Sequence, residues 1–116
     1  MKMQISSTEI WLADEPVDFR KSILGLSEIV LTHYQRNLNS AAYVFYNKAR
    51  NKIKCLGCHR NGFVLIYKVL NKKRFTVKEN ATGLVALKEQ ELSWLLAGLD
   101  WENMSNWNEL NYEDYY

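Results

Sequence analysis

The 116-residue sequence contains one proline, five glycines and two cysteines, and it has no long uninterrupted apolar run. Its longest apolar stretch, FVLIYKVL, is broken by Lys68 and is far shorter than the roughly 18 residues of a membrane span. The first residues also lack the apolar core of a secretory signal. We therefore expect a cytoplasmic protein without membrane association, whose cysteines stay reduced. At this length, a domain buries about two-thirds of its unfolded surface and folds without disulfides or metal.

Short β-prone and amphipathic segments alternate along the chain. EIWLA, residues 9–13, predicts a first strand, and Pro16 then favours a turn. Asp18 is placed to cap a helix that follows this turn. The apolar residues of that helix recur at three- and four-residue spacing and are Phe19, Ile23, Leu26, Val30 and Tyr34.

The middle and the end of the chain complete the predicted architecture. AAYVFYN, KIKCLGC, FVLIYKVL and RFTV predict four strands joined by polar turns, and HRNG carries an Asn-Gly hairpin signal. Regularly spaced leucines predict a helix over about 88–97 that stops at Gly98. We therefore predict a single-domain α+β fold over residues 1–102, with an antiparallel meander sheet of about 4–5 strands, a helix after the first strand and a helix near the C-terminus. Residues 103–116 are acidic and aromatic and are predicted to form a mobile tail.

The segment from Cys55 to His59 reads C-x-x-C-H, the attachment pattern of a c-type haem. On a strand, Cys55 and Cys58 would point to opposite faces, which opposes attachment of one haem to both. A zinc site would need His33 from a distant element, since no second C-x-x-C is present. We therefore expect reduced structural thiols and no haem, metal or other cofactor.

Catalytic patterns are also missing from the sequence. It contains no nucleophile elbow, no Walker loop and no glycine-rich dinucleotide fingerprint. Asp14, Glu15 and Asp18 gather at one turn, where carboxylates most often cap a helix. A metal-dependent nuclease would need carboxylates in the basic middle of the chain, which has none. We expect a protein that is not an enzyme.

The strongest departure from an ordinary mixed surface is the distribution of charge. Residues 47–78 contain ten Lys and Arg residues and no Asp or Glu, whereas residues 79–116 contain one Lys and eight acids. In an extended strand, Lys52 and Lys54 would project from one face, and Arg50 and Lys48 would continue that row. Such a row fits the phosphate backbone of DNA, although lysines that solubilise a sheet edge give the same pattern. The predicted phosphate contacts are Lys48, Arg50, Lys52, Lys54, Arg60, Lys72, Lys73 and Arg74.

Three blocks in fixed order resemble one known family. IWLADEPVDFRKSILGL is similar to an opening in which a W-L strand leads into D-M-R-K-x-x-x-G-L, with Phe19 here in the usual Met position. YVFYNKARNKIKCLGCHRNGFVLIYKVLNKKRF and VALKEQELSWLLAGLDW match the two blocks that follow. Over roughly residues 9–102, the chain resembles the TnpB-type accessory proteins of IS-sixty-six-type bacterial insertion sequences. Where the family shows an aromatic and an acidic residue, this chain has Cys58 and His59.

The resemblance implies a non-catalytic accessory protein for transposition whose partner is the transposase of the same element. The basic positions that match the family are Arg20, Lys21, Arg50, Lys54, Lys68 and Arg74. Direct contact with DNA is our hypothesis. The alternative is an adaptor that binds the transposase without touching DNA, through an aromatic end consisting of Trp101, Trp107, Tyr112, Tyr115 and Tyr116. Arg20 is also placed to pair with Asp18 or Asp14 instead of binding DNA.

Overall fold

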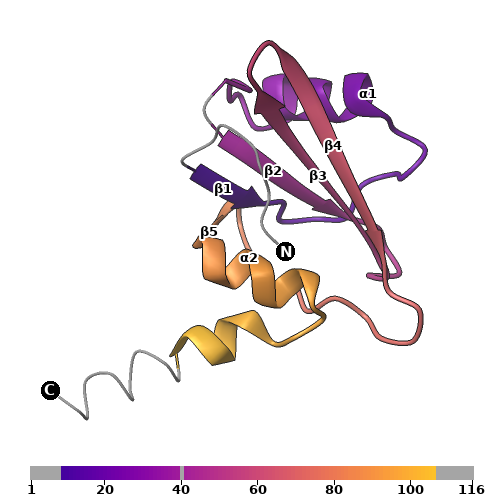
Figure 1. The fold of residues 1–116 in the computed structure, drawn as a ribbon, viewed down its shortest axis with the longest axis vertical. Coiled ribbons are helices and arrows are strands. Elements are labelled where there is room, and N and C mark those ends of the chain that lie inside the picture. Colours follow the sequence, from indigo (N-terminus) through magenta and orange to yellow (C-terminus); the bar gives the residue numbers. More distant parts are fainter. Residues whose placement is uncertain (1–8, 40, 107–116) are drawn as a thin grey trace, which may run out of the picture.

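The computed structural model describes residues 9–39 and 41–106 (Figure 1). A 5-stranded sheet has the order β4-β3-β2-β1-β5. Its strands are β1 (Glu9–Leu12), β2 (Ala41–Tyr46), β3 (Lys52–His59), β4 (Gly62–Val69) and β5 (Val85–Leu87). The helices are α1 (Ile23–Glu28), the π-helical stretch η1 (Ile29–His33) that continues it, and α2 (Glu89–Leu96). Residues 101–106 are also helical, and no helix in the described part is long and apolar enough to cross a membrane.

The sheet is mixed, not a pure meander. β2, β3 and β4 are successive antiparallel neighbours, as the sequence predicts. β1 instead pairs with β2 in parallel, because α1 and η1 carry the chain back across the sheet between them. β5 closes the other side by pairing antiparallel with β1. The predicted class, a single α+β domain, is confirmed.

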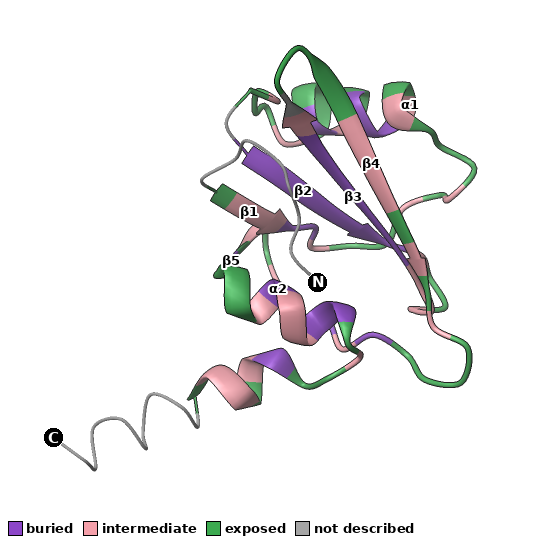
Figure 2. Ribbon diagram, in the orientation of Figure 1, coloured by how far each residue is buried: buried purple, intermediate pink, exposed green. Residues whose placement is uncertain are grey.

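The two central strands carry the core. β2 is buried along its whole length, while β4 at the edge is exposed or half-buried throughout (Figure 2). One face of the sheet meets the segment around α1 and η1, where the Tyr43 hydroxyl donates to the carbonyl oxygen of Asn37 at 2.8 Å. The apolar cluster also includes Leu92, Leu95 and Leu96 of α2. In Figure 1, α2 lies beside β5 and the chain that follows β4.

RFTV, residues 74–77, is not the fourth strand of the predicted meander. The segment is buried at Phe75 and Val77, and the Phe75 amide donates to the Arg50 carbonyl oxygen at 2.6 Å. The indole Nε1 of Trp101 donates to the Thr76 carbonyl oxygen at 2.8 Å. Alternating apolar residues therefore mark burial here without a strand ladder. The prediction that Trp101 serves a partner-binding aromatic end is wrong, since it is a core residue. Trp107, Tyr112, Tyr115 and Tyr116 lie outside the described residues.

The first helix begins later than predicted, at Ile23, and Asp18 is not its N-cap. The Asp18 carboxylate instead accepts the Arg20 backbone N–H at 2.9 Å and the Arg20 guanidinium at 2.6 Å. The predicted apolar stripe is still the inner side, with Leu26 and Val30 fully buried. The second helix matches its prediction: the Lys88 backbone N–H donates to Glu91 at its start, and Gly98 has a φ of 78° just beyond its end.

Candidate nucleic-acid interface

Apart from Lys54, the predicted phosphate contacts lie at the two ends of the β3–β4 hairpin. Lys52 pairs with Val69 at one end, and His59 pairs with Gly62 at the other. Seven residue steps separate these ends, which is about 23 Å along a strand. Arg60 therefore lies far from the residues at 48–52 and 72–74. We call the cations at 48–52 and 72–74 the basic end, which consists of Lys48, Arg50, Lys52, Lys72, Lys73 and Arg74.

The loop between β2 and β3 is held by asparagine side chains. The Asn47 Oδ1 accepts the backbone N–H groups of Asn51 and Lys52, each at 3.0 Å. The Asn47 Nδ2 donates to the Asn51 Oδ1 at 2.6 Å. Arg50 adopts a positive φ of 58° inside this loop. Such a turn fixes the positions of Lys48 and Arg50 in the loop. The Asn-rich segment NKARN is the sequence pattern that indicates it.

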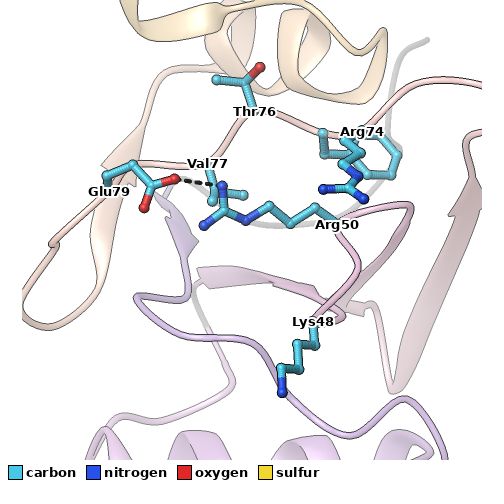
Figure 3. A pocket seen from close by; sticks show the side chains of 7 residues that line it. Lys48, Arg50, Arg74, Thr76, Val77 and Glu79 are labelled. Atoms are coloured by element: carbon cyan, nitrogen blue, oxygen red, sulfur yellow. Dashed lines mark hydrogen bonds and ion pairs between the residues drawn. The ribbon is translucent and has the colours of Figure 1, made fainter.

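Two backbone hydrogen bonds join this loop to the segment that follows β4. The Leu70 N–H donates to the Asn51 carbonyl at 2.8 Å, next to the contact between Phe75 and Arg50. As a result, the loop and residues 74–79 surround one open hollow of about 470 Å³ (Figure 3). Arg50 and Arg74 lie together there, and Lys48 extends away from them. The hollow is lined by Lys48, Arg50, Arg74, Phe75, Thr76, Val77 and Glu79.

Arg50 is paired with Glu79, the first acidic residue after the basic segment 47–78. Its Nη1 lies 2.5 Å from the Glu79 Oε1. This hydrogen bond lowers the pKa of Glu79 and raises that of Arg50. The pair holds the guanidinium at the hollow, and it also offsets part of the charge that a phosphate would meet.

Lys54 is removed from the surface, contrary to the predicted row of exposed cations. Its side chain is only 7% exposed, and its Nζ donates to the carbonyl oxygens of Phe19 and Lys21, each at 2.8 Å. The ammonium also lies 5.0 Å from the ring centre of Phe19 and 5.4 Å from that of Tyr67. Lys54 therefore fastens the segment before α1 to the sheet. The signal in the sequence is its position on a strand beside aromatic cross-strand neighbours, Phe45 and Tyr67.

The two cysteines do not form a paired site. Cys55 is fully buried, and burial raises the pKa of its thiol to about 12. The Cys58 thiol donates to the Leu38 carbonyl oxygen at 2.6 Å. Both are free thiols, and the odd spacing on β3 directs them to opposite faces, as expected from the strand alternation.

Three groups outside the basic end come close enough to suggest a metal site. Asp14, Glu15 and His33 each place one ligand atom within 4.8 Å of the others. The Asp14 oxygens, however, accept hydrogen bonds from the Tyr34 hydroxyl at 2.7 Å and the Gly83 N–H at 2.8 Å. Glu15 lies 3.4 Å from the His33 ring nitrogen, and both are exposed. These contacts account for the cluster as an exposed contact between Glu15 and His33 beside a structural carboxylate.

The fold and the site define a small α+β protein in which six Lys and Arg residues gather at one end of the β3–β4 hairpin. A family model described as IS66 Orf2 like protein matches residues 8–106. The chain belongs to this family, which connects it with the accessory proteins of insertion sequences. It is 30% identical over 97 residues to "Uncharacterized protein y4jC" of Sinorhizobium fredii, covering 79% of this chain and 80% of that protein. It is 26% identical over 98 residues to "Uncharacterized protein y4hO" of the same organism, covering 84% and 85%. No solved structure is significantly similar.

Proposed function

We propose that the protein assists transposition of a bacterial insertion sequence by contacting DNA phosphates through its basic end. The observation that carries this proposal is the convergence of the 48–52 loop and the 72–74 connection at one end of the hairpin. Cations from two separate chain segments there share one open surface, which is what a phosphate backbone requires. Family membership supplies the setting of mobile DNA.

The arrangement favours backbone contact over sequence reading. The described helices do not project as separate recognition elements, since α1 and α2 contribute buried residues to the core and the helical residues 101–106 contribute Trp101. Without base contacts, the affinity for different duplexes should be similar. Arg50 would have to exchange Glu79 for a phosphate, so Glu79 sets how strongly that arginine contributes.

The test is a salt-dependent titration of the full-length protein against an element-end duplex and an unrelated duplex. We expect similar affinities for both and a steep fall of log affinity with log salt, about 0.9 per phosphate contact. Lys48→Glu and Arg74→Glu should each weaken binding and reduce the slope by about 1. Glu79→Gln should strengthen binding because it releases Arg50.

The matched control is Arg36→Glu, which makes the same change of charge away from the basic end. Arg36 lies 4.4 Å above the ring of Trp11 on β1. If Arg36→Glu weakens binding as much as Arg74→Glu, only net charge matters and the assigned surface is wrong. No binding at low salt would contradict DNA contact and leave the adaptor function, which pull-down with the transposase would then test.

A further inference from the structure

The outer edge of β4 has no strand partner among residues 9–39 and 41–106. β4 is 8 residues long and ends the sheet on the side away from β5 (Figure 1). A strand of this length in an edge position offers a row of unpaired backbone groups to another strand. What would pair there depends on which groups point outward and what the side chains beside them are.

The hairpin turn fixes which residues point outward. His59 and Gly62 are paired across the two-residue turn of Arg60 and Asn61, and such turns close on a hydrogen-bonded pair. The backbone N–H and C=O groups of the even-numbered residues of β4 therefore point toward β3. The hydrogen bond from the Leu70 N–H to the Asn51 carbonyl oxygen follows the same alternation. The residues with outward N–H and C=O groups are consequently Phe63, Leu65, Tyr67 and Val69.

The same four residues share one face of β4, and on β4 this face carries no charged side chain. Phe63 is 48% exposed, Tyr67 48% and Val69 50%. Native edge strands are usually protected by proline, a bulge or several charges. β4 contains no proline, and its one charged residue, Lys68, is on the opposite face, where it pairs with Ile53. The edge is therefore built for pairing more than for protection.

We propose that two copies of the chain pair antiparallel through β4, with the two-fold axis at Ile66. This register is the one that uses all four outward residues of each strand. It places Phe63 opposite Val69 and Leu65 opposite Tyr67, so that apolar side chains meet apolar side chains. On the other face, Lys68 lies opposite Val64 and does not meet its own copy. The two sheets thereby form one continuous sheet.

The register also has a consequence for charge. It brings the Arg60 turn of one copy toward the 71–73 connection of the other. Arg60 therefore lies beside the basic end of the second copy, although it is far from the basic end of its own chain. These like charges oppose association, and salt should therefore tighten the dimer or leave it unchanged. The pairing itself does not depend on the proposed DNA contact, so either can fail alone.

The test is sedimentation velocity of the full chain from about 1 to 200 µM. An interface formed by a single edge strand from each copy is small, and it predicts a dimer with a dissociation constant at or above about 1 µM. The double variant Phe63→Lys, Val69→Lys sets like charges across each end pair, and its dimer should be at least about tenfold weaker. The matched double variant Phe63→Lys, Val69→Glu sets opposite charges across the same pairs and should regain the dimer.

Leu24→Lys controls for loss of exposed apolar surface in general, since Leu24 is 82% exposed on α1. It should leave the dimer intact, and circular dichroism should show that all variants keep the fold. A wild-type chain that is monomeric at every concentration overturns the proposal, and β4 would then be open to an extended segment of another protein. Equal weakening by both double variants, or loss of the dimer in Leu24→Lys, also overturns it.

Discussion

Lys54 exchanges water for two backbone carbonyls and two aromatic faces, whereas Lys52, two residues earlier on the same face of β3, keeps part of its surface in solvent. Burying an ammonium is costly unless its donors are paired. The carbonyls of Phe19 and Lys21 meet that need, because the segment between Pro16 and α1 passes directly over the strand. A cation that matches the family pattern is therefore a structural residue in this chain.

We predict that Lys54→Met destabilises the protein by about 2–4 kcal/mol, because it keeps the aliphatic stem but leaves the Phe19 and Lys21 carbonyls without a donor. Lys52→Met removes the same charge at a half-exposed site and should change stability by only about 0.5 kcal/mol. Urea unfolding of the two variants gives the comparison. Equal midpoints would mean that water or another donor satisfies these carbonyls, and the structural assignment of Lys54 would be wrong.

Asp14 links three secondary-structure elements through the hydrogen bonds of its carboxylate. It follows β1, accepts from Tyr34 at the end of η1, and accepts from the Gly83 N–H just before β5. Burial raises the pKa of its carboxyl and the hydrogen bonds from Tyr34 and Gly83 lower it, and the net result is a pKa below its ordinary 3.8. The carboxylate thus stabilises this junction only while it is ionised.

The sign of the pH dependence follows from the lowered pKa of Asp14. Its contribution to the free energy of unfolding is present above pH 3.8 and is lost as pH falls through the folded-state pKa. We predict that Asp14→Asn flattens the fall in stability measured by urea unfolding between about pH 5 and pH 2. Tyr34→Phe removes one donor and should flatten it less. Parallel curves for wild type and Asp14→Asn would contradict the role of this carboxylate.

Periodicity predicts the elements of this protein better than it predicts their connections. β1 to β4 and α2 follow from local patterns, and so does the Gly98 stop with its positive φ. RFTV has the alternation of a strand, but the hydrogen bonds of Phe75 and Thr76 go to Arg50 and Trp101, which no local pattern contains. The burial of Lys54 depends on a segment more than thirty residues earlier in the chain for the same reason. The charge pattern of the sequence, by contrast, does predict the residues of the basic end. Only the β3–β4 register shows that Arg60 lies at the opposite end of the hairpin from them.

Over the whole molecule, a net charge of only +2 conceals two opposed regions. The basic end lies at one end of the β3–β4 hairpin, while the acids are concentrated after residue 78. The pair of Arg50 and Glu79 is one contact between the two regions. Lys78, at the end of the basic segment 47–78, also lies 3.5 Å from Glu102. A polyanion therefore meets a field that the C-terminal acids weaken, and the range of that effect is about 10 Å at 0.1 M salt.

This opposition predicts how the end of the chain affects DNA binding. Deleting residues 107–116 removes Glu109, Glu113 and Asp114 and no basic residue, which changes the net charge from +2 to +5. We expect DNA affinity to rise several-fold at about 50 mM salt and the gain to shrink at about 300 mM, because screening shortens the reach of these acids. The same titrations used for the basic end would measure this gain.

The matched control keeps residues 107–116 and neutralises their acids with Glu109→Gln, Glu113→Gln and Asp114→Asn. If electrostatic opposition is the cause, this full-length variant should gain DNA affinity as the deletion does, because both lose the same three negative charges. If the aromatic residues there bind the transposase, pull-down of transposase should fall for the deletion and remain for the neutralised chain. A deletion that lowers DNA affinity would mean that residues 107–116 take part in the contact, and the field argument would then be wrong.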